Sequence, residues 1–430
     1  MEEGLNLQFN CQPFDLAFHP HSNVFAVGLV DGGMQLHTYK QSASDTLSSS
    51  LALGLASHSD AVRSLAFSKD GQSLFSGSTD RSIRRMNSSG QITWVANEGH
   101  SSTVTRVVPV DEIGSIILSG DEEGTIKLWD SRSKTSSASS SSSAAKPMFT
   151  FSNHEDAISD MLVENERHSV ISASCDGTLS IYDLRKGRIL SRTEQDEDEL
   201  LSICAIKGGQ SFVVGTQGGV LQIWEKGHMD SSSDKYEGCE RFTGHPESID
   251  AILQVDDDTI ITGSSDGILR LITVRPNKLV GVIGEHSDFP VERLAWSRDR
   301  TIVGSISHDL AVKLWDVRWL FEEDDDPKER STLTTSKAAL GAGGGGGSSI
   351  TQSGKSKFIS LPAIALQSRH GDEDDEEDED EDEDEELMND EEEIEVEAPK
   401  KSSSKGKKSN KSKKSSDTKK SKFYEGLEED

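Results

Sequence analysis

The chain has 430 residues, and 76 Asp and Glu against 45 Lys and Arg give it a formal net charge of −31 at pH 7. This balance argues against a protein that binds nucleic acid by bulk electrostatics, because phosphate contacts need clustered Lys and Arg. No apolar run approaches the ~18 residues of a membrane span, and the acidic start Met1–Gly4 lacks the apolar core of a secretion signal.

The first predicted element is a strand at Leu5–Phe9, where apolar and polar residues alternate with period two. The last of the repeated units described next ends at Trp315-Asp316, and no further unit follows to supply its outer strand. We therefore expect Leu5–Phe9 to pair beside Leu310–Trp315. The alternative is a frayed terminus.

A pattern of seven repeated units follows, each with a turn residue and, six positions later, a mostly large residue. The turn residues, 42 to 53 residues apart, are Asp31, Asp80, Glu123, Asp176, Gly218, Asp266 and Asp309. The residues six positions later are His37, Met86, Trp129, Tyr182, Trp224, Ile272 and Trp315. Five units also carry a His 21 to 23 residues before the turn: His58, His100, His154, His245 and His286. A nearly fixed offset at this period is typical of a repeat architecture.

Each unit contains short apolar runs bounded by Gly, Ser, Asn or Asp, such as Ala61–Phe67, Ser115–Leu118 and Thr125–Trp129. Such runs are typical of strands joined by tight turns. One four-stranded unit cannot bury both of its faces, whereas seven arranged radially bury each other and leave few exposed edges.

The pattern resembles the WD-repeat β-propeller family, whose units carry a Gly-His pair and a Trp-Asp pair. Gly99-His100 and Gly244-His245 match the first pair, and Trp129-Asp130 and Trp315-Asp316 match the second. The resemblance covers roughly residues 11 to 318 and implies an all-β, seven-bladed propeller, which we assign to residues 1–320 with the N-terminal strand closing the last blade. It also implies a protein-interaction scaffold, and we expect a monomeric propeller.

In this family the His, a strand Ser or Thr, the turn Asp and the Trp form a buried hydrogen-bonded set, and a buried carboxylate needs such partners. The resemblance assigns this structural role to His100, Trp129, His154, Asp176, Tyr182, His286, Asp309 and Trp315. Units one, two, five and six depart from the pattern, and we expect them to rely more on apolar packing. In the fifth unit, the acidic residues 193–199 replace the Gly-His segment.

After the repeats the composition changes, and we divide the tail into three segments. Residues 321–371 form a linker that contains the Gly/Ser run Gly341–Ser349 and an apolar island at 356–366. The island either docks on the propeller or a partner, or is a passive apolar stretch. An acidic run at 372–397 and a Lys-rich segment at 398–430 follow, and blocks of like charge are typical of disordered interaction tails.

The Lys-rich segment is predicted to target the protein to the nucleus or nucleolus, with a purely solubilising tail as the alternative. Any direct nucleic-acid contact would be weak and made through this segment. The acidic run is predicted either to hold basic partners such as histones or simply to be solvated. The candidate targeting residues are Lys400, Lys401, Lys405, Lys407, Lys408, Lys411, Lys413, Lys414, Lys419, Lys420 and Lys422.

An Arg stands two residues after the Asp of three units, at Arg132, Arg185 and Arg318. In WD-repeat proteins this spacing resembles the element by which some propellers dock onto a cullin-4 ubiquitin-ligase adaptor, and a guanidinium suits bidentate carboxylate recognition. The alternative is a local salt bridge to the neighbouring blade.

Motifs of catalysis and of metal binding are missing from the sequence. There is no GxSxG, no HExxH, no phosphate-binding Gly loop with Lys and no CxxC pair, so we expect no enzyme activity, metal or cofactor. The scattered cysteines argue against a disulfide framework and favour reduced thiols. They are Cys11, Cys175, Cys204 and Cys239.

Within the WD-repeat proteins, the chain is similar to the family of WD repeat-containing protein 55. Supporting phrases are Phe14–Pro20 near the start and Leu314–Arg318 at the end of the repeats, together with the acidic-then-basic tail. The resemblance implies a nucleolar role in producing ribosomal RNA for the large subunit, with pre-ribosomal proteins as partners. The cullin-4 receptor and the histone-binding factor are the alternative functions.

Overall fold

The computed structural model describes residues 4–41, 47–132, 145–164, 168–225, 239–287 and 289–321. The predicted linker after Phe321, the acidic run and the Lys-rich segment lie outside these residues. Within the described ranges the chain forms 28 strands and two short 3₁₀ segments, Lys207–Gly209 and Arg318–Leu320. This part of the chain holds no helix with the length and hydropathy of a membrane span.

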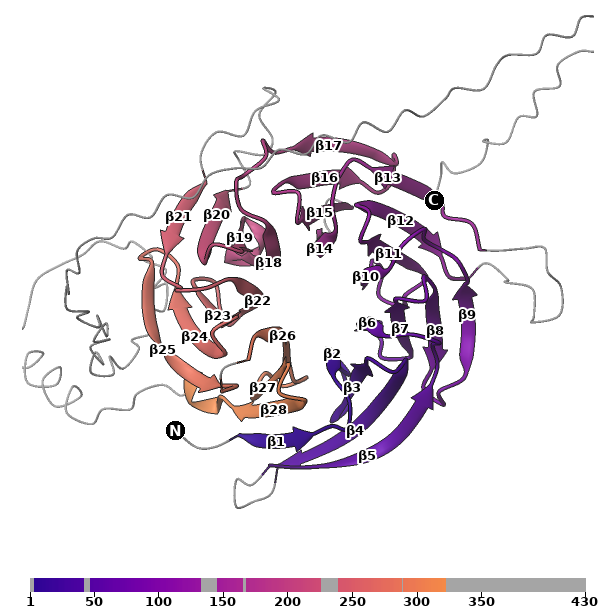
Figure 1. Ribbon diagram of the computed structural model, residues 1–430, viewed down its shortest axis with the longest axis horizontal. Helices are drawn as coiled ribbons and strands as arrows, with labels where there is room; N and C mark the ends of the chain where they lie inside the picture. Colours follow the sequence, from indigo (N-terminus) through magenta and orange to yellow (C-terminus); the bar gives the residue numbers. More distant parts are fainter. Residues whose placement is uncertain are drawn as a thin grey trace, which may run out of the picture. The chain divides into compact units, whose positions relative to one another are not determined.

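The strands form seven four-stranded antiparallel sheets around a common axis, so the fold is a seven-bladed β-propeller (Figure 1). Blade 1 contains β2 (Pro13–Phe18), β3 (Val24–Leu29), β4 (Gly33–Gln41) and β5 (Leu47–Ala56). Blade 2 contains β6 (Val62–Phe67), β7 (Ser73–Ser78), β8 (Ile83–Asn87) and β9 (Ile92–Ala96). Blade 3 contains β10 (Val104–Pro109), β11 (Ile116–Asp121), β12 (Thr125–Asp130) and β13 (Phe149–Ser152). Blade 4 contains β14 (Ile158–Glu164), β15 (Ser169–Ser174), β16 (Leu179–Asp183) and β17 (Arg188–Arg192).

The last three blades follow the same order, except that the outer strand of blade 7 comes from the N-terminus. Blade 5 contains β18 (Leu200–Ile206), β19 (Ser211–Thr216), β20 (Val220–Glu225) and β21 (Glu240–Thr243). Blade 6 contains β22 (Ile249–Gln254), β23 (Thr259–Ser264), β24 (Ile268–Thr273) and β25 (Lys278–Glu285). Blade 7 contains β26 (Val291–Trp296), β27 (Ile302–Ser307), β28 (Ala311–Asp316) and β1 (Leu5–Gln8).

The second strand of each blade is packed between its two neighbouring blades, and in five blades every residue of this strand is buried. Small residues in these strands let the blades approach each other. A Cβ at Gly263 would lie 2.6 Å from Val291, and one at Gly304 would lie 2.6 Å from Leu16 of the next blade. The close packing of flat blades therefore depends on these positions having no side chain.

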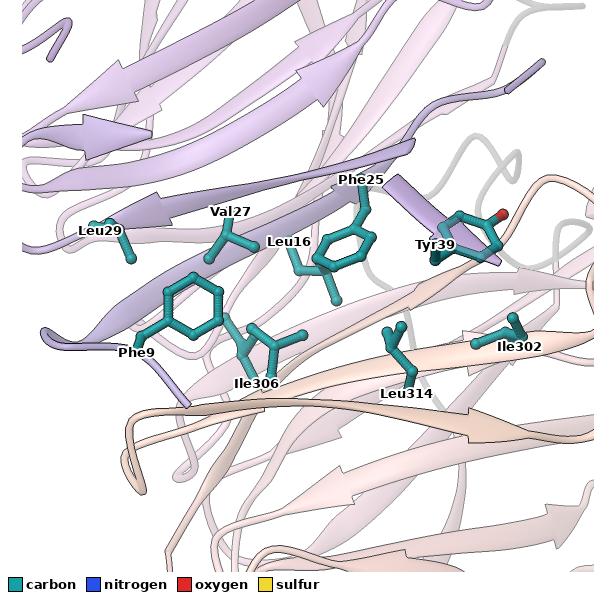
Figure 2. Close-up of a cluster of buried hydrophobic side chains, with 10 residues drawn as sticks. Phe9, Leu16, Phe25, Val27, Leu29, Tyr39, Ile302, Ile306 and Leu314 are labelled. Carbon is teal, nitrogen blue, oxygen red and sulfur yellow. The ribbon is translucent and has the colours of Figure 1, made fainter. Parts of the chain in front are cut away.

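The N-terminal strand β1 closes the ring by pairing antiparallel with β28. Leu5 lies opposite Leu314, and the amide of Phe9 continues the ladder with a 2.8 Å hydrogen bond to the carbonyl of Leu310. Phe9 is 7% exposed and packs in a cluster that joins blades 7 and 1 (Figure 2). The strand lies where the period-two alternation of the sequence predicts it.

Side chains on the innermost strands connect consecutive blades. Asp15 accepts a 2.6 Å hydrogen bond from the amide of Leu65, one blade further on. Ser64 in turn accepts a 3.0 Å hydrogen bond from the amide of Val107 in blade 3. These bonds satisfy backbone donors beside the central channel and tie blades 1, 2 and 3 to one another.

Candidate functional site

The antiparallel order gives the propeller two distinct faces. Loops between the second and third strands, and between consecutive blades, lie on one face, which we call the His face because it carries His100 and Asp121. Loops between the first and second and between the third and fourth strands lie on the other face. We call it the Arg face because Arg132 and Arg318 directly follow a third strand.

Blade 3 contains a complete buried hydrogen-bonded set. His100 Nδ1 lies 2.7 Å from Asp121 Oδ2, and His100 Nε2 lies 2.6 Å from Ser119 Oγ. Ser119 Oγ also accepts a 2.8 Å hydrogen bond from Trp129 Nε1. Because the carboxylate can only accept, Nδ1–H donates to Asp121; in a neutral ring Nε2 then accepts from the hydroxyl of Ser119. Burial lowers the pKa of His100, in agreement with a neutral ring.

The carboxylate of this blade comes from Asp121 rather than from the turn position Glu123. Asp121 Oδ1 accepts from the amides of Glu123 and Thr125, at 3.1 and 2.7 Å, so the same side chain also shapes the turn. The Glu123 carboxylate accepts instead from the hydroxyl of Ser101 at the exposed surface.

Blade 7 repeats this arrangement at the turn position itself. His286 Nδ1 lies 2.9 Å from Asp309 Oδ2, and His286 Nε2 lies 2.6 Å from Ser305 Oγ. Trp315 Nε1 donates to Ser305 Oγ across 2.8 Å. Although burial opposes ionisation, the hydrogen bond from His286 holds the pKa of Asp309 below its ordinary value.

Blades 4 and 2 keep the His and Asp but not the Trp. In blade 4, His154 lies 3.1 Å from Asp176 and 2.7 Å from Ser172, and the ring of Tyr182 packs 4.5 Å from that of Phe151. In blade 2, His58 lies 3.0 Å from Asp80 Oδ2 and 2.7 Å from Ser76 Oγ, and buried Met86 takes the Trp position. The second blade therefore has a nearly complete polar set, although its sequence departs from the repeat pattern.

Blade 5 has a different polar set in place of the missing His. Asp196, from the acidic segment 193–199, accepts from Gln222 Nε2 at 2.8 Å and from Arg241 at 2.7 Å. Trp224 Nε1 donates to Gln222 Oε1 at 3.3 Å. The expectation that this blade relies more on apolar packing did not include this polar set. The available signals in the sequence were the Gln two residues before the Trp and the acidic segment.

Blades 6 and 1 depart furthest from the pattern. In blade 6, His245 keeps its 2.8 Å contact with Thr262, but Asp266 pairs with Arg270 instead of the His. Burial lowers the pKa of His245 to about 4. In blade 1, the ring of His37 stacks on Phe25 with centroids 5.3 Å apart, so aromatic packing replaces the polar set as expected.

On the Arg face, the three candidate docking arginines share one local geometry. Asp130, Asp183 and Asp316 each accept a hydrogen bond from the amide of the Arg two residues on. The guanidinium of Arg132 forms a 2.8 Å ion pair with Asp130, and that of Arg318 forms a 2.6 Å pair with Asp316. These pairs lie within one blade and not between neighbouring blades. Each Arg still exposes a large part of its side chain: Arg132 65%, Arg185 65% and Arg318 39%.

The central channel contains a cavity of about 240 Å³ lined by charged side chains of the innermost strands. Arg106 lies 3.2 Å from Asp160, and Arg293 lies 3.8 Å from Asp15. No group of three or more His, Cys, Asp or Glu in the described ranges is arranged to hold a metal ion. The candidate targeting lysines and the acidic run fall outside these ranges.

The comparisons with known proteins agree with this fold. The WDR55 family model matches residues 5–320. The chain is 35% identical over 320 residues to the WD repeat-containing protein 55 homolog of Dictyostelium discoideum, covering 74% of this chain and 72% of that protein. It is 33% identical over 320 residues to WD repeat-containing protein 55 of Arabidopsis thaliana, covering 74% and 84%. It is 30% identical over 306 residues to the Homo sapiens protein of that name, covering 71% and 74%. The chain therefore belongs to the WDR55 family of WD-repeat proteins.

Proposed function

We propose that this chain is a non-enzymatic protein-interaction scaffold that acts in the nucleus and nucleolus in ribosome biogenesis, in rRNA processing for the large subunit. The nucleolar part of the proposal is supported by the family resemblance and by the acidic-then-basic tail. The scaffold part is supported by the geometry of the polar sets.

The observation that carries the scaffold role is the inaccessibility of the Asp-His-Ser sets. Asp121, His100 and Ser119 have the connectivity of a hydrolase triad, in which a His takes the proton of a nucleophilic Ser. However, they are only 0%, 3% and 0% exposed, and the hydroxyl of Ser119 also accepts from Trp129. A substrate cannot reach this Ser, so the set stabilises the blade. The surfaces that a partner protein can reach are the loops on the two faces of the propeller.

The ribosome-biogenesis role is tested by depleting the protein and following rRNA by pulse labelling. We expect precursors of the large-subunit rRNA to accumulate, and re-expression of the full chain to restore their processing. Unchanged precursor levels after complete depletion would contradict this role.

The Lys-rich segment allows a second test, which concerns the localisation of the protein and not its role in rRNA processing. A fluorescent fusion that ends at Pro399 lacks every candidate targeting Lys. We expect it to lose the nuclear and nucleolar enrichment of the full-length fusion. Equal enrichment of both fusions would show that this segment does not target the protein to the nucleus or nucleolus.

A second candidate function is a substrate receptor of a cullin-4 ubiquitin ligase. It is favoured by three arginines with partly exposed side chains that follow the third strands of blades 3, 4 and 7 on the Arg face. Changing Arg132, Arg185 and Arg318 together to Ala tests it by adaptor pull-down. Loss of adaptor binding with normal rRNA processing would indicate a separate ligase role, and unchanged binding would remove the candidate.

The histone-binding alternative depends on the acidic run alone. Deleting residues 372–397 removes this run and leaves the propeller sequence intact. Histone recovery in a pull-down should fall if the run holds basic partners. Unchanged recovery would eliminate this alternative.

A further inference from the structure

The outer edge of blade 1 differs from the other blade edges. β5 has ten residues, the longest strand of the described ranges, and contains no charged residue. It is the last strand of its sheet and pairs only with β4 among the described strands, so its second edge is open. The other outer strands are either charged or short: β17, β21 and β25 carry charges, and the uncharged β1, β9 and β13 have only four or five residues. Charges and short length are the usual protection of an edge against further pairing, and β5 lacks both.

An apolar groove of about 420 Å³ adjoins this edge, between blades 1 and 2. No Asp, Glu, Lys or Arg lines it in the described part of the chain. His19 stands at one end, and burial lowers the pKa of its ring. The groove therefore suits uncharged apolar side chains. Its apolar walls are Leu36, Leu53, Leu55, Phe67, Leu74 and Met86.

The groove opens on the Arg face, where the described chain also ends. Its loop residues His19 and Gly71 follow first strands, and Gly90 lies between a third and a fourth strand. β28 is a third strand, so the chain leaves blade 7 on the same face.

A short series of contacts links the chain end to the groove. The ring of Phe321 lies 6.2 Å from that of Trp296. Two residues after Trp296, Arg298 donates a 3.2 Å hydrogen bond to the carbonyl of His21 in blade 1. The amide of His21 in turn donates to His19 Nδ1 at the end of the groove.

We propose that residues 357–364 of this chain, Lys-Phe-Ile-Ser-Leu-Pro-Ala-Ile, bind as a fifth strand on the free edge of β5 with alternate side chains in the groove. This segment lies outside the described residues and is part of the apolar island of the tail. Addition of an extended segment to an open edge is a common recognition mode, in which the backbone gives affinity and alternate side chains give specificity.

The order of residues in the segment fits one side of such a strand. In a β-strand, residues two apart share both the side-chain face and the direction of their backbone hydrogen bonds. Ile359, Leu361 and Ala363 then pair with β5 and enter the groove. Pro362 belongs to the opposite set, so its missing N–H faces outward and leaves the ladder intact. A proline on the new outer edge also prevents further pairing.

The linker length allows this intramolecular binding. Thirty-five residues separate Phe321 from Lys357, and a flexible chain of that length spans about 33 Å on average. Tethering at this range gives an effective concentration on the order of millimolar, so even weak docking is populated. A partner that binds this edge must displace the segment. The proposal does not depend on the nucleolar role.

Site-specific photocrosslinking in the full chain tests the proposal. Leu51, which is 58% exposed on β5, is replaced by a benzophenone amino acid, and the products are mapped by mass spectrometry. We expect a crosslink to residues 357–364 within the same polypeptide, with a yield that does not change on tenfold dilution. The matched control is the same probe at Leu190, 51% exposed on the outer strand of blade 4, which should give no such crosslink.

Two tail variants distinguish docking from random collision. Leu361→Asp places a charge in the groove and should abolish the crosslink, whereas Ser360→Asp points outward and should keep it. Three outcomes would overturn the proposal: no crosslink to 357–364, equal effects of the two variants, or crosslinks between copies whose yield rises with concentration. The last would assign the edge to a second copy of the chain.

Discussion

His100 Nδ1 and Asp121 Oδ2 lie 2.7 Å apart, and neither side chain has any exposed surface. Asp121 stands two residues before the turn position at which the other blades of this type carry their Asp. One carboxylate therefore binds the His through Oδ2 and the turn amides through Oδ1.

The first prediction compares how much Asp121 and Glu123, the two acidic residues of the blade 3 turn, contribute to stability. Asp121→Ala should lower the free energy of unfolding by about 3 kcal/mol, because it leaves His100 Nδ1–H and two amides without their acceptor. Glu123→Ala should cost less than about 1 kcal/mol, since this carboxylate binds only at the exposed surface. Denaturant unfolding followed by Trp fluorescence measures both. Equal losses in the two variants would contradict the assignment.

Closure of the ring gives the second prediction. Phe9→Ala should destabilise the protein by about 3–5 kcal/mol, because the ring of Phe9 is buried between blades 7 and 1 (Figure 2). Phe321→Ala is the control, since Phe321 is 48% exposed and its loss should change stability little. Limited proteolysis should then cut the Phe9→Ala variant faster. An unchanged melting temperature in Phe9→Ala would show that β1 is not needed to close the propeller.

Stability should fall as the pH decreases from about 7 to about 5. Burial lowers the pKa of His245 to about 4 and also lowers those of His100, His37 and His19. The unfolded chain, with an ordinary His pKa near 6.5, then binds more protons than the folded one, so acid favours unfolding. His245 alone should contribute about 2 kcal/mol of loss between pH 7 and pH 5.

Thermal unfolding at pH 7, 6 and 5 measures this dependence. His245→Gln should reduce the slope, because Gln does not titrate. The pKa of Asp80 and that of Asp176 lie below the ordinary range, so the stability that these ionised carboxylates contribute at neutral pH is lost only below this pH range. A melting temperature that rises on acidification to pH 5 would contradict the neutral buried His rings.

The thiols provide a chemical prediction. Burial raises the pKa of Cys175 and of Cys204 to about 12. The reactive thiolate is then scarce at pH 8, so iodoacetamide should modify these residues far more slowly in the folded protein than in guanidinium. Peptide mass spectrometry over time gives both rates. Comparable rates in the two states would show that these thiols are accessible and ionised.

Much of the architecture could be predicted from local patterns in the sequence. The spacing from His100 to Trp129 and from His286 to Trp315 marks the units, and period-two alternation marks the strand at Leu5–Phe9. These signals are local because turn chemistry and side-chain alternation act over a few residues.

The sequence did not predict which side chains form the hydrogen bonds and ion pairs in the blades that depart from the repeat pattern. Asp121 and Glu123 are both acidic and two residues apart, and only the folded geometry distinguishes them. In blade 5, Asp196, Gln222 and Arg241 come from three different segments. The sequence shows there that an acidic segment replaces the Gly-His pair and that a Gln stands two residues before the Trp, but not that these groups meet. In blade 6, Arg270 forms an ion pair with Asp266, so the Asp does not bind the His. The repeat spacing does not predict this change of partner.

Affinity purification of the tagged full chain from nuclear extract, with mass spectrometry of the bound proteins, tests the proposed role most directly. We predict recovery of precursors of the large ribosomal subunit. Recovery of the ligase adaptor or of histones without any pre-ribosomal protein would contradict it.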